Sequence, residues 1–451
     1  MKFVEDLINK RILLVGFARE GVSSLNFLRR HFPVKKIGVF DQKNLGDLDQ
    51  KAQKLIKKDL NLILFLGQKD FSELKNIAGD FDLIIKSAGI PNKLLPSEIQ
   101  TKLTTQTAIF FDNFPGEIIG VTGTKGKSTT SSLIYAVLKE SGKKTKLLGN
   151  IGAPCLDFLD KVEPDVICVF EISSHQLSTL TKSPWIAVIL NIYPEHLDFY
   201  TNLASYIEAK TNITKYKTPK DFLIYNNDDD AVKKIAAGSL ARKIPFNKDM
   251  AKKIDGKTKL EGDHNRLNIL AATKAAEILD INLAVVKKAV ANFKPLPHRL
   301  EKVGTYKGIT FYNDSLSTIP EAAANALWGL GDRVETLICG GFDRGIDFSP
   351  VAEAVLKSHV RNLILFPTTG EKIWQEILKI DPGAKKKYRH LFTAKMGEAI
   401  KFSYRHTSVG KICLLSNASP SFGVFKDYAD RGNQFKKWVR FYSLEKASKK
   451  R

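Results

Sequence analysis

Short apolar runs alternate with longer amphipathic segments along the whole chain. Runs of four or five apolar residues bounded by turn signals are typical of buried strands, whereas an apolar repeat of three to four positions predicts a helix. Strands are expected at 11–15, 36–40, 62–66, 82–85, 118–121, 166–170, 186–190, 222–225, 309–312, 336–339, 363–366 and 412–415. Helices are expected at 22–31, 128–140 and 264–279. This alternation predicts an α/β fold built on parallel sheets.

The predicted elements fall into three blocks, 1–105, 106–296 and 297–451. The proline-rich stretch KPLP at 294–297 separates the last two blocks and suits a hinge. A chain of 451 residues has room for three domains at about 150 residues each. We therefore expect a three-domain α/β protein with these bounds.

Composition narrows the class of protein. Hydrophobic residues make up 43% and charged residues 26%, which argues against a disordered or fibrous chain. No apolar run of about 18 residues is present, and the opening MKFVEDLINKR has no apolar centre, so we expect neither a membrane helix nor a signal peptide. The widely spaced cysteines predict buried thiols in a reducing, cytoplasmic compartment rather than a disulfide set or zinc ligands. They are Cys155, Cys168, Cys339 and Cys413.

The formal net charge of +22 raises the question of a nucleic-acid partner. The lysines are scattered in short clusters along the chain, and no basic-region helix, RNA-binding aromatic signature or zinc finger is present. We therefore expect general surface charge and no nucleic-acid partner. The charge is compatible with an anionic small-molecule substrate.

The strongest local motif is GVTGTKGKSTT at 120–130, between an apolar strand and an amphipathic helix. Glycines there let backbone N–H groups turn toward phosphate oxygens, and the helix N-terminus adds partial positive charge. Lys127 can reach the terminal phosphates, and the hydroxyl of Ser128 suits a Mg²⁺ position. The strict phosphate-loop pattern would have glycine where this chain has Val121. Because strand and helix are both in place, we favour an ATP site over a chance glycine-rich turn.

A weaker loop, GFAREG at 16–21, follows the first strand. It has the outline of a dinucleotide fingerprint with Ala18 at the middle glycine position, and Asp41 ends the next strand. A nucleotide-like ligand is expected here, and a plain tight turn is the alternative.

Polar residues follow two other strands of the central block. Glu171 ends the strand at 166–170, and His196 and Asp198 follow the strand at 186–190. The carboxyl edge of a parallel sheet beside a phosphate loop is where a Mg²⁺ ligand is expected. Each residue alone would more often be structural, but two such edges beside one phosphate loop favour a role in metal or substrate binding.

Taken together, these motifs resemble the Mur ligase family of peptidoglycan synthesis. The similarity runs in order over nearly the whole chain. It rests on TGTKGKST (122–129), GNIG (149–152), EISSHQL (171–177), NIYPEHLD (191–198), EAK (208–210), GDHN (262–265), LPHRLE (296–301), YNDS (312–315), GGFDRGIDF (340–348) and FKDYADRGNQF (425–435).

The resemblance implies an N-terminal Rossmann-like domain for a UDP-sugar, a central P-loop ATPase with a parallel sheet, and a C-terminal Rossmann-like domain for the incoming amino acid. It implies a cytoplasmic, monomeric ligase that uses ATP and Mg²⁺, with UDP-N-acetylmuramoyl-L-alanine and glutamate as the other substrates and no membrane insertion. ATP would phosphorylate the alanyl carboxylate, and the glutamate amine would displace phosphate from the acyl phosphate.

The resemblance also implies roles for individual residues. The family's catalytic positions correspond to Lys127, Glu171, His196 and Lys210. Its magnesium ligands correspond to Ser128, Glu171, His196 and, if carbamylated, Lys210, for which a solvated helix lysine is the alternative. The ATP site would comprise Gly123, Thr124, Lys125, Gly126, Lys127, Ser128, Thr129, Asn265, Asn268 and Arg299. The UDP-sugar site would comprise Arg19, Glu20, Asp41, Gly89 and Asn150. The glutamate site would comprise Thr318, Arg344, Ser421 and Tyr428.

Three departures from the family pattern lie in the predicted amino-acid pocket. Leu316 stands where a lysine is common, Arg344 replaces a glutamate-binding lysine, and SPSFG at 419–423 replaces a Cys-Ala-Ser type sequence. Arginine keeps the charge but binds a carboxylate through a planar fork, so the exchange is not equivalent. As a set, these departures resemble the branch of the family that adds L-glutamate. The resemblance of the whole chain still favours D-glutamate, and L-glutamate is the alternative.

Two further classes remain as alternatives. A folylpolyglutamate-synthase-like ligase would share the central and C-terminal blocks but lack the first hundred residues. A non-catalytic nucleotide-dependent binding protein would not need Lys127, Glu171, His196 and Lys210 together.

Overall fold

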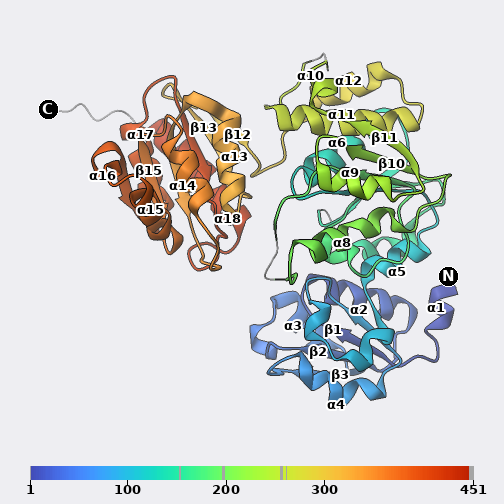
Figure 1. The fold of residues 1–451 in the computed structure, drawn as a ribbon. Coiled ribbons are helices and arrows are strands. Elements are labelled where there is room, and N and C mark those ends of the chain that lie inside the picture. The colour runs from blue at the N-terminus through green and yellow to red at the C-terminus, as the bar shows by residue number, and fades with distance from the viewer. Residues whose placement is uncertain (1, 152–153, 196–198, 254–256, 261, 446–451) are drawn as a thin grey trace. The chain divides into compact units, whose positions relative to one another are not determined.

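The computed structural model describes residues 2–151, 154–195, 199–253, 257–260 and 262–445. The chain divides into two compact units (Figure 1). The first comprises 1–258 and 263–293, and the second comprises 259–262 and 294–451. The first unit holds two sheets and the second unit holds one.

The N-terminal sheet has the strand order β3-β2-β1-β4-β5, and every pairing is parallel. Its strands are β1 (Ile12–Val15), β2 (Ile37–Asp41), β3 (Leu62–Leu66), β4 (Leu83–Lys86) and β5 (Leu103–Thr104). Its helices are α1 (Lys2–Asp6), α2 (Arg19–His31), α3 (Gln50–Lys58) and α4 (Leu74–Ile77). Helix α2 begins three residues before the predicted start, because the turn after β1 takes only residues 16–18, with Gly16 at φ +86°.

The central sheet has the order β11-β10-β9-β6-β8-β7, again with parallel pairings throughout. Its strands are β6 (Ile118–Thr122), β7 (Thr145–Gly149), β8 (Ile167–Glu171), β9 (Ile186–Ile189), β10 (Phe222–Asn226) and β11 (Arg242–Phe246). Its helices are α6 (Lys127–Glu140), α7 (Ser174–Leu177), α8 (Leu203–Lys215), α9 (Asp230–Ala237), α10 (Lys248–Lys252), α11 (Asp263–Ile278) and α12 (Leu283–Asn292).

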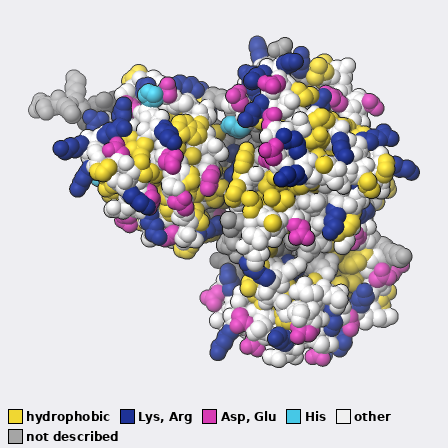
Figure 2. Space-filling view, viewed as in Figure 1, with side chains coloured by type: hydrophobic (Ala, Val, Ile, Leu, Met, Phe, Trp, Pro, Cys, Tyr) yellow, Lys and Arg dark blue, Asp and Glu magenta, His cyan; other side chains and the backbone are white. Residues whose placement is uncertain are grey.

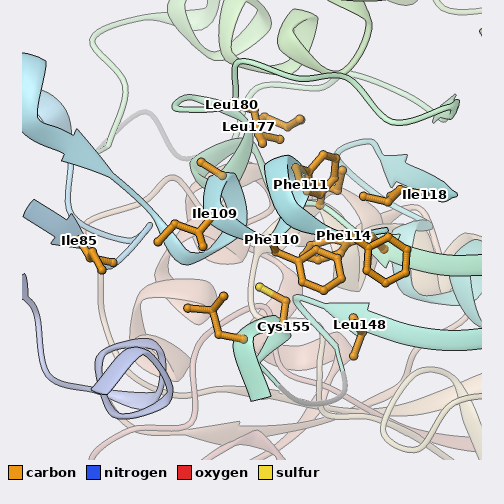
Figure 3. Packing of buried hydrophobic residues seen from close by; sticks show 14 of the residues in the cluster. Ile85, Ile109, Phe110, Phe111, Phe114, Ile118, Leu148, Cys155, Leu177 and Leu180 are labelled. Atoms are coloured by element: carbon orange, nitrogen blue, oxygen red, sulfur yellow. The ribbon is translucent and has the colours of Figure 1, made fainter. Parts of the chain in front are cut away.

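Helix α5 (Gln106–Asn113) packs where the cores of the N-terminal and central sheets meet. The rings of Phe110 and Phe111 lie 5.6 and 5.3 Å from that of Phe170 on β8, and Phe110 stacks on Phe114 at 4.8 Å (Figure 3). Ile85 of β4 belongs to the same buried cluster, so one continuous apolar core joins the two sheets.

The sheet of the second unit has the order β12-β13-β17-β14-β15-β16. Only the pairing of β12 with β13 is antiparallel among the described strands. The strands are β12 (Glu301–Tyr306), β13 (Ile309–Asp314), β14 (Val334–Gly340), β15 (Asn362–Phe366), β16 (Arg389–Phe392) and β17 (Ile412–Ser416). The helices are α13 (Pro320–Leu330), α14 (Ser349–Leu356), α15 (Thr369–Ile380), α16 (Ala384–Lys387), α17 (Met396–His406) and α18 (Tyr428–Leu444). The predicted α/β class with parallel sheets is confirmed.

All twelve predicted strands are present, and the five strands that were not predicted are β5, β7, β11, β12 and β16. Each of these five lies at an edge of its sheet. Edge strands are covered on fewer sides and carry more charge, as in RKIPF of β11 and RHLF of β16, so their apolar pattern is weak.

The distribution of basic side chains on the surface agrees with the prediction of scattered charge. Lysine and arginine side chains are spread over the visible face with acidic and apolar side chains between them (Figure 2). The four cysteines are buried and free, as predicted. Within the described part of the chain, no helix combines the length and hydropathy needed to cross a membrane.

Candidate active site

The phosphate-loop motif joins β6 to α6 in the middle of the central sheet. Gly123 and Gly126 have φ values of +156° and +86°, which favour glycine. A Cβ atom on Gly126 would lie 2.5 Å from Oδ1 of Asn268, and one on Gly123 would lie 2.9 Å from Cβ of Leu190. The loop is therefore closely enclosed, and side chains at these positions would distort it.

Lys127 is the first residue of α6 and turns back over the loop. Its Nζ donates hydrogen bonds of 2.9 Å to the carbonyl oxygens of Gly123 and Thr124. This orientation keeps the ammonium at the mouth of the loop, where it can meet phosphate oxygens. Ser128 and Thr129 follow in the first turn, and both are buried.

The segment after β9 forms one wall of the loop. The side-chain oxygen of Asn191 accepts from the backbone N–H of Lys125 at 2.7 Å, and its amide donates to the carbonyl of Lys125 at 3.0 Å. Lys125 Nζ also pairs with Glu195 at 2.8 Å. The hydroxyl of Thr124 lies 2.9 Å from that of Tyr206 on α8. His196 and Asp198, the predicted ligands of this segment, lie outside the described residues.

Glu171 ends β8, directly beside Val121 of β6. It is 1% exposed, and its Oε1 accepts a 3.1 Å hydrogen bond from the side-chain amide of Asn150. Its Oε2 is buried and has no hydrogen-bond partner in the described structure. A buried carboxylate oxygen is costly unless it is paired with a donor or a cation. Glu171 therefore has one oxygen available for a cation.

The oxygen donors among the described residues fit a magnesium ion. No group of three or more His, Cys, Asp or Glu side chains suited to a metal is found among the described residues. Mg²⁺ commonly takes one or two carboxylates and completes its shell with water and substrate phosphates. The carboxylate of Glu171 and the hydroxyl of Ser128 match that donor set, and Mg²⁺ would there neutralise phosphate charge.

Lys210 lies on α8 and is 1% exposed. Its Nζ donates to the carbonyl of Gly123 at 3.1 Å and lies 4.8 Å from the centre of the Tyr206 ring. Burial lowers the pKa of Lys210 well below its ordinary value, the charges of Lys127 and Lys125 lower it further, and Glu195 opposes the shift. This shift makes the neutral amine easier to form here than at an exposed lysine. The burial of Lys210 contradicts the solvated-lysine alternative.

Two asparagines of α11 reach the phosphate loop from the other side. Oδ1 of Asn268 accepts from the hydroxyl of Thr130 at 3.2 Å, and its amide donates to Asn265 at 3.1 Å. Both are buried. The third predicted residue of the ATP base and ribose site, Arg299, belongs to the second compact unit and is partly buried there.

The loop at 16–21, which was predicted to bind a nucleotide, is organised by two carboxylates. Asp41 accepts from the backbone N–H of Phe17 at 2.6 Å, and Glu20 accepts from that of Ala88 at 2.8 Å. These bonds join the turn after β1 to the ends of β2 and β4. Arg19 and Gly89 are exposed at the same edge of the sheet. The structure brings Asn150 to Glu171 in the central sheet, so this residue lies apart from the other four predicted UDP-sugar residues.

In the second unit, an aspartate and an arginine order the carboxyl edge of the sheet. Asp314 ends β13 and accepts from Ser416 at 2.8 Å and from the backbone of Leu300 at 3.0 Å. Burial raises the pKa of its carboxyl group, and these hydrogen bonds oppose the shift. The guanidinium of Arg431 donates to the side chain and carbonyl of Ser315 at 2.9 and 2.8 Å and to the carbonyl of Ser419 at 3.1 Å.

The residues predicted to bind glutamate lie around these hydrogen bonds. Ser421 is 3% exposed, whereas Arg344 is exposed and Thr318 is partly buried. Tyr428, 42% exposed, begins α18, and its carbonyl accepts from Ser315 at 2.8 Å. The backbone N–H of Phe342 donates to the carbonyl of Pro420, which ties the loop at 340–348 to the loop at 417–423. The residues predicted to bind glutamate thus lie on segments at the carboxyl edge of the sheet of the second unit.

Sequence reasoning missed several residues that organise these sites. Asn191, Glu195 and Tyr206 hold the phosphate loop, and Arg431 holds the C-terminal loops. Asn191 and Glu195 stand in the NIYPEHLD motif, so the motif was the available signal. Arg431 stands in the FKDYADRGNQF motif at 425–435, so that motif was the available signal for this residue.

Comparison with known proteins agrees with this geometry. The family model described as the Mur ligase middle domain matches residues 121–286. The UDP-N-acetylmuramoylalanine--D-glutamate ligase of Acetivibrio thermocellus is 33% identical, with 97% of both chains covered. The chain belongs to the Mur ligase family. The corresponding ligase of Clostridioides difficile is 32% identical over 96% of this chain and 98% of that protein.

Solved structures of Mur ligases share the fold. The UDP-N-acetylmuramate-alanine ligase of Thermotoga maritima superposes with a TM-score of 0.57 at 19% identity, covering 96% of this chain and 99% of that one. The MurF ligase of Thermotoga maritima, solved in complex with ADP, gives a TM-score of 0.55 at 18% identity over 82% of this chain and 92% of that one. The chain therefore has the three-domain Mur ligase fold and belongs to a family that uses ATP.

Proposed function

We propose that the chain is an ATP-dependent ligase that joins D-glutamate to UDP-N-acetylmuramoyl-L-alanine in the synthesis of peptidoglycan precursors. The observation that carries this function is the near full-length similarity to D-glutamate ligases, including one at 33% identity. The enclosed phosphate loop beside the buried carboxylate of Glu171 supplies the chemistry that such a ligase needs. We also infer that the enzyme acts as a monomer in the cytoplasm.

The three domains divide the substrates between them. We assign the UDP-sugar to 1–105, ATP to 106–296 and glutamate to 297–451. Arg19, Glu20, Asp41 and Gly89 would bind the uridine diphosphate, because they meet at the carboxyl edge of the N-terminal sheet. Asn150 would contact the far end of the same substrate, close to the phosphate loop, which accounts for its place beside Glu171.

The first chemical step is phosphorylation of the alanyl carboxylate. A carboxylate is a poor electrophile, and transfer of the γ-phosphoryl group of ATP converts it into an acyl phosphate and releases ADP. The Lys127 ammonium and the N-terminus of α6 stabilise the negative charge that moves during this transfer. Glu171, Ser128 and His196 would hold Mg²⁺. The asparagines Asn265 and Asn268 and the guanidinium of Arg299 would bind the base and ribose of ATP.

The second step forms the amide. The uncharged amine of glutamate attacks the acyl carbon, the tetrahedral intermediate collapses, and phosphate leaves. Arg344 provides the charge for a glutamate carboxylate, with Thr318, Ser421 and Tyr428 beside it on the same sheet edge. The pocket differs from the common family pattern at Leu316 and Arg344. For this reason D-glutamate and L-glutamate are tested as separate substrates.

Lys210 is the best candidate for modification. A buried, neutral amine can take up carbon dioxide as a carbamate with loss of one proton, which turns a potential cation into an anion. That anion would offset the charges of Lys125 and Lys127 and add an oxygen ligand for Mg²⁺. The support for this role is the burial of Lys210 and the strong lowering of its pKa.

The test is phosphate release from ATP in the presence of UDP-N-acetylmuramoyl-L-alanine, with D-glutamate or L-glutamate added separately. Turnover is expected with D-glutamate. Turnover with L-glutamate and none with D-glutamate would show that the enzyme adds L-glutamate. No turnover with either would exclude a glutamate ligase. Lys127→Ala should abolish turnover, and a near-normal rate in that variant would remove the phosphate loop from the mechanism.

A further inference from the structure

A lysine is buried at the end of a strand in the N-terminal sheet. Lys86 is the last residue of β4 and is 2% exposed. Ile84 and Ile85 before it are apolar core residues. Burying an ammonium group is costly unless it is hydrogen-bonded or paired, and none of the roles given above uses this side chain.

The position of Lys86 in the sheet is that of a ligand site. β4 pairs with β1 on the side opposite β2, and Lys86 lies opposite Val15. The strand order therefore reverses at β1, with β2 and β3 on one side of it and β4 and β5 on the other. In open parallel sheets, nucleotides bind in the crevice at the carboxyl ends of the strands where the order reverses. Lys86 is thus at the edge where the proposed uridine diphosphate site lies.

Two turns meet at this edge of the sheet. The hydroxyl of Ser87 donates to the carbonyl of Gly16 at 3.0 Å. A Cβ atom on Gly16 would lie 2.9 Å from Cδ1 of Ile90 and from Oγ of Ser87. The turn at 87–90 therefore packs directly against the turn after β1, and a shift of one changes the other.

The turn at 87–90 is held by two charged side chains from different elements. Glu20 of α2 accepts from the backbone N–H of Ala88 at 2.8 Å, and Lys86 Nζ donates to the carbonyl of Ile90 at 2.8 Å. Between these two anchors lies Gly89, which is exposed. Hydrogen bonds to charged groups are stronger than neutral ones, so the pair restrains the turn from both ends.

We propose that Lys86 is a positioning residue that fixes the turn at 87–90 for the uridine diphosphate end of the UDP-sugar. This inference rests on the proposed function. Methionine or isoleucine at this strand position would fill the same volume without burying a charge, but would leave the Ile90 carbonyl without its donor. Burial lowers the pKa of Lys86 to about 8, and Glu20 opposes the shift, so the ammonium form prevails at neutral pH.

The experiment compares Lys86→Met with a matched control, Lys217→Met. Lys217 is 3% exposed and also donates to backbone carbonyls, those of Pro184 and Trp185, but it lies in the central domain. Binding of UDP is measured by calorimetry on the full chain, with steady-state constants for UDP-N-acetylmuramoyl-L-alanine and ATP. The melting temperature of each variant is recorded in parallel.

Lys86→Met should weaken UDP binding and raise the KM for the UDP-sugar about tenfold, or about 1.4 kcal/mol. The kcat and the KM for ATP should stay within about twofold. Lys217→Met should leave UDP affinity unchanged even where it lowers the melting temperature equally. Lys86→Gln keeps an N–H donor and should show a smaller weakening of the same sign, which also covers a methionine variant that fails to fold.

The outcomes separate the inference from the function on which it rests. Wild-type protein that binds no UDP would overturn the nucleotide site and the inference together. Wild-type binding that both Lys86 variants retain in full would overturn the inference alone. Equal loss of UDP affinity in Lys217→Met would assign the effect to general destabilisation and would overturn it as well.

Discussion

Replacement of Arg431 by methionine tests how the C-terminal domain holds its proposed glutamate site together. Arg431 is 0% exposed on α18. Its guanidinium donates three hydrogen bonds, two to Ser315 at 2.9 and 2.8 Å and one to the carbonyl of Ser419 at 3.1 Å. Ser315 follows β13 and Ser419 follows β17, so the side chain ties together two loops at one sheet edge.

The expected magnitude follows from these bonds. A hydrogen bond to a charged group contributes about 1.5–3 kcal/mol to the free energy of unfolding, and such contributions do not add fully. Methionine removes the free-energy cost of burying the guanidinium. That cost is visible in the pKa of Arg431, which burial lowers and the charge of Asp314 raises. Three lost bonds less this relief give a net loss of about 3 kcal/mol in the free energy of unfolding of the second unit.

Tryptophan fluorescence during urea unfolding is a suitable assay. Of the four tryptophans, Trp328, Trp374 and Trp438 lie in the second compact unit, so the signal reports mainly on that unit. With a urea dependence of about 1–3 kcal/mol per molar, the unfolding midpoint should fall by about 1 M or more. The KM for glutamate should rise in the same variant, because Ser421 lies on the loop that is released.

The control is Arg440→Met, an arginine on the same helix whose side chain is exposed. A surface substitution of this kind should change the free energy of unfolding by no more than about 0.5 kcal/mol. If the midpoints of Arg431→Met and Arg440→Met coincide, the three hydrogen bonds do not stabilise the domain and the reasoning is refuted.

Three other predictions concern the central domain. Gly126→Ala should raise the KM for ATP more than tenfold, because position 126 has a positive φ and the new Cβ would lie 2.5 Å from Oδ1 of Asn268. The control is Gly142→Ala, where φ is +78° but no atom lies within 4 Å of the new Cβ; it should lower the free energy of unfolding by only about 1–2 kcal/mol and leave the KM for ATP unchanged. Glu171→Gln should lower kcat by about a hundredfold or more and raise the Mg²⁺ concentration needed for half-maximal rate; a rate with unchanged magnesium dependence would contradict the metal role. Burial lowers the pKa of Lys217 to about 7 from 10.5, so between these pH values the unfolded chain binds more protons and the free energy of unfolding should rise with pH. Urea unfolding at pH 6.5 to 9.5 should show this rise in the wild type and a flatter profile in Lys217→Met. Parallel profiles of the two proteins would contradict this prediction.

Part of the candidate site was predictable because it is local in sequence. The phosphate loop needs a strand, two glycines and a helix start within a dozen residues, and all three are visible in GVTGTKGKSTT. Glu171 was predictable for the same reason, as the polar residue that ends an apolar run. The contacts that hold this site join residues far apart in the chain. Asn191 lies 66 residues from Lys125, and no local pattern predicts their pairing.

The sequence by itself determined the class of fold, the central strands of each sheet and the identity of the phosphate loop. The eleven interior strands are apolar on both faces and are visible as runs, as is the apolar edge strand β3, whereas the five strands not predicted are sheet edges with mixed polarity. Tertiary structure decided which polar groups are buried. Lys86 is an ordinary basic residue in the sequence, and Lys210 and Arg431 stand out there only through motifs that resemble the family's. Only packing against distant segments removes these side chains from water and directs their N–H groups at particular carbonyl groups.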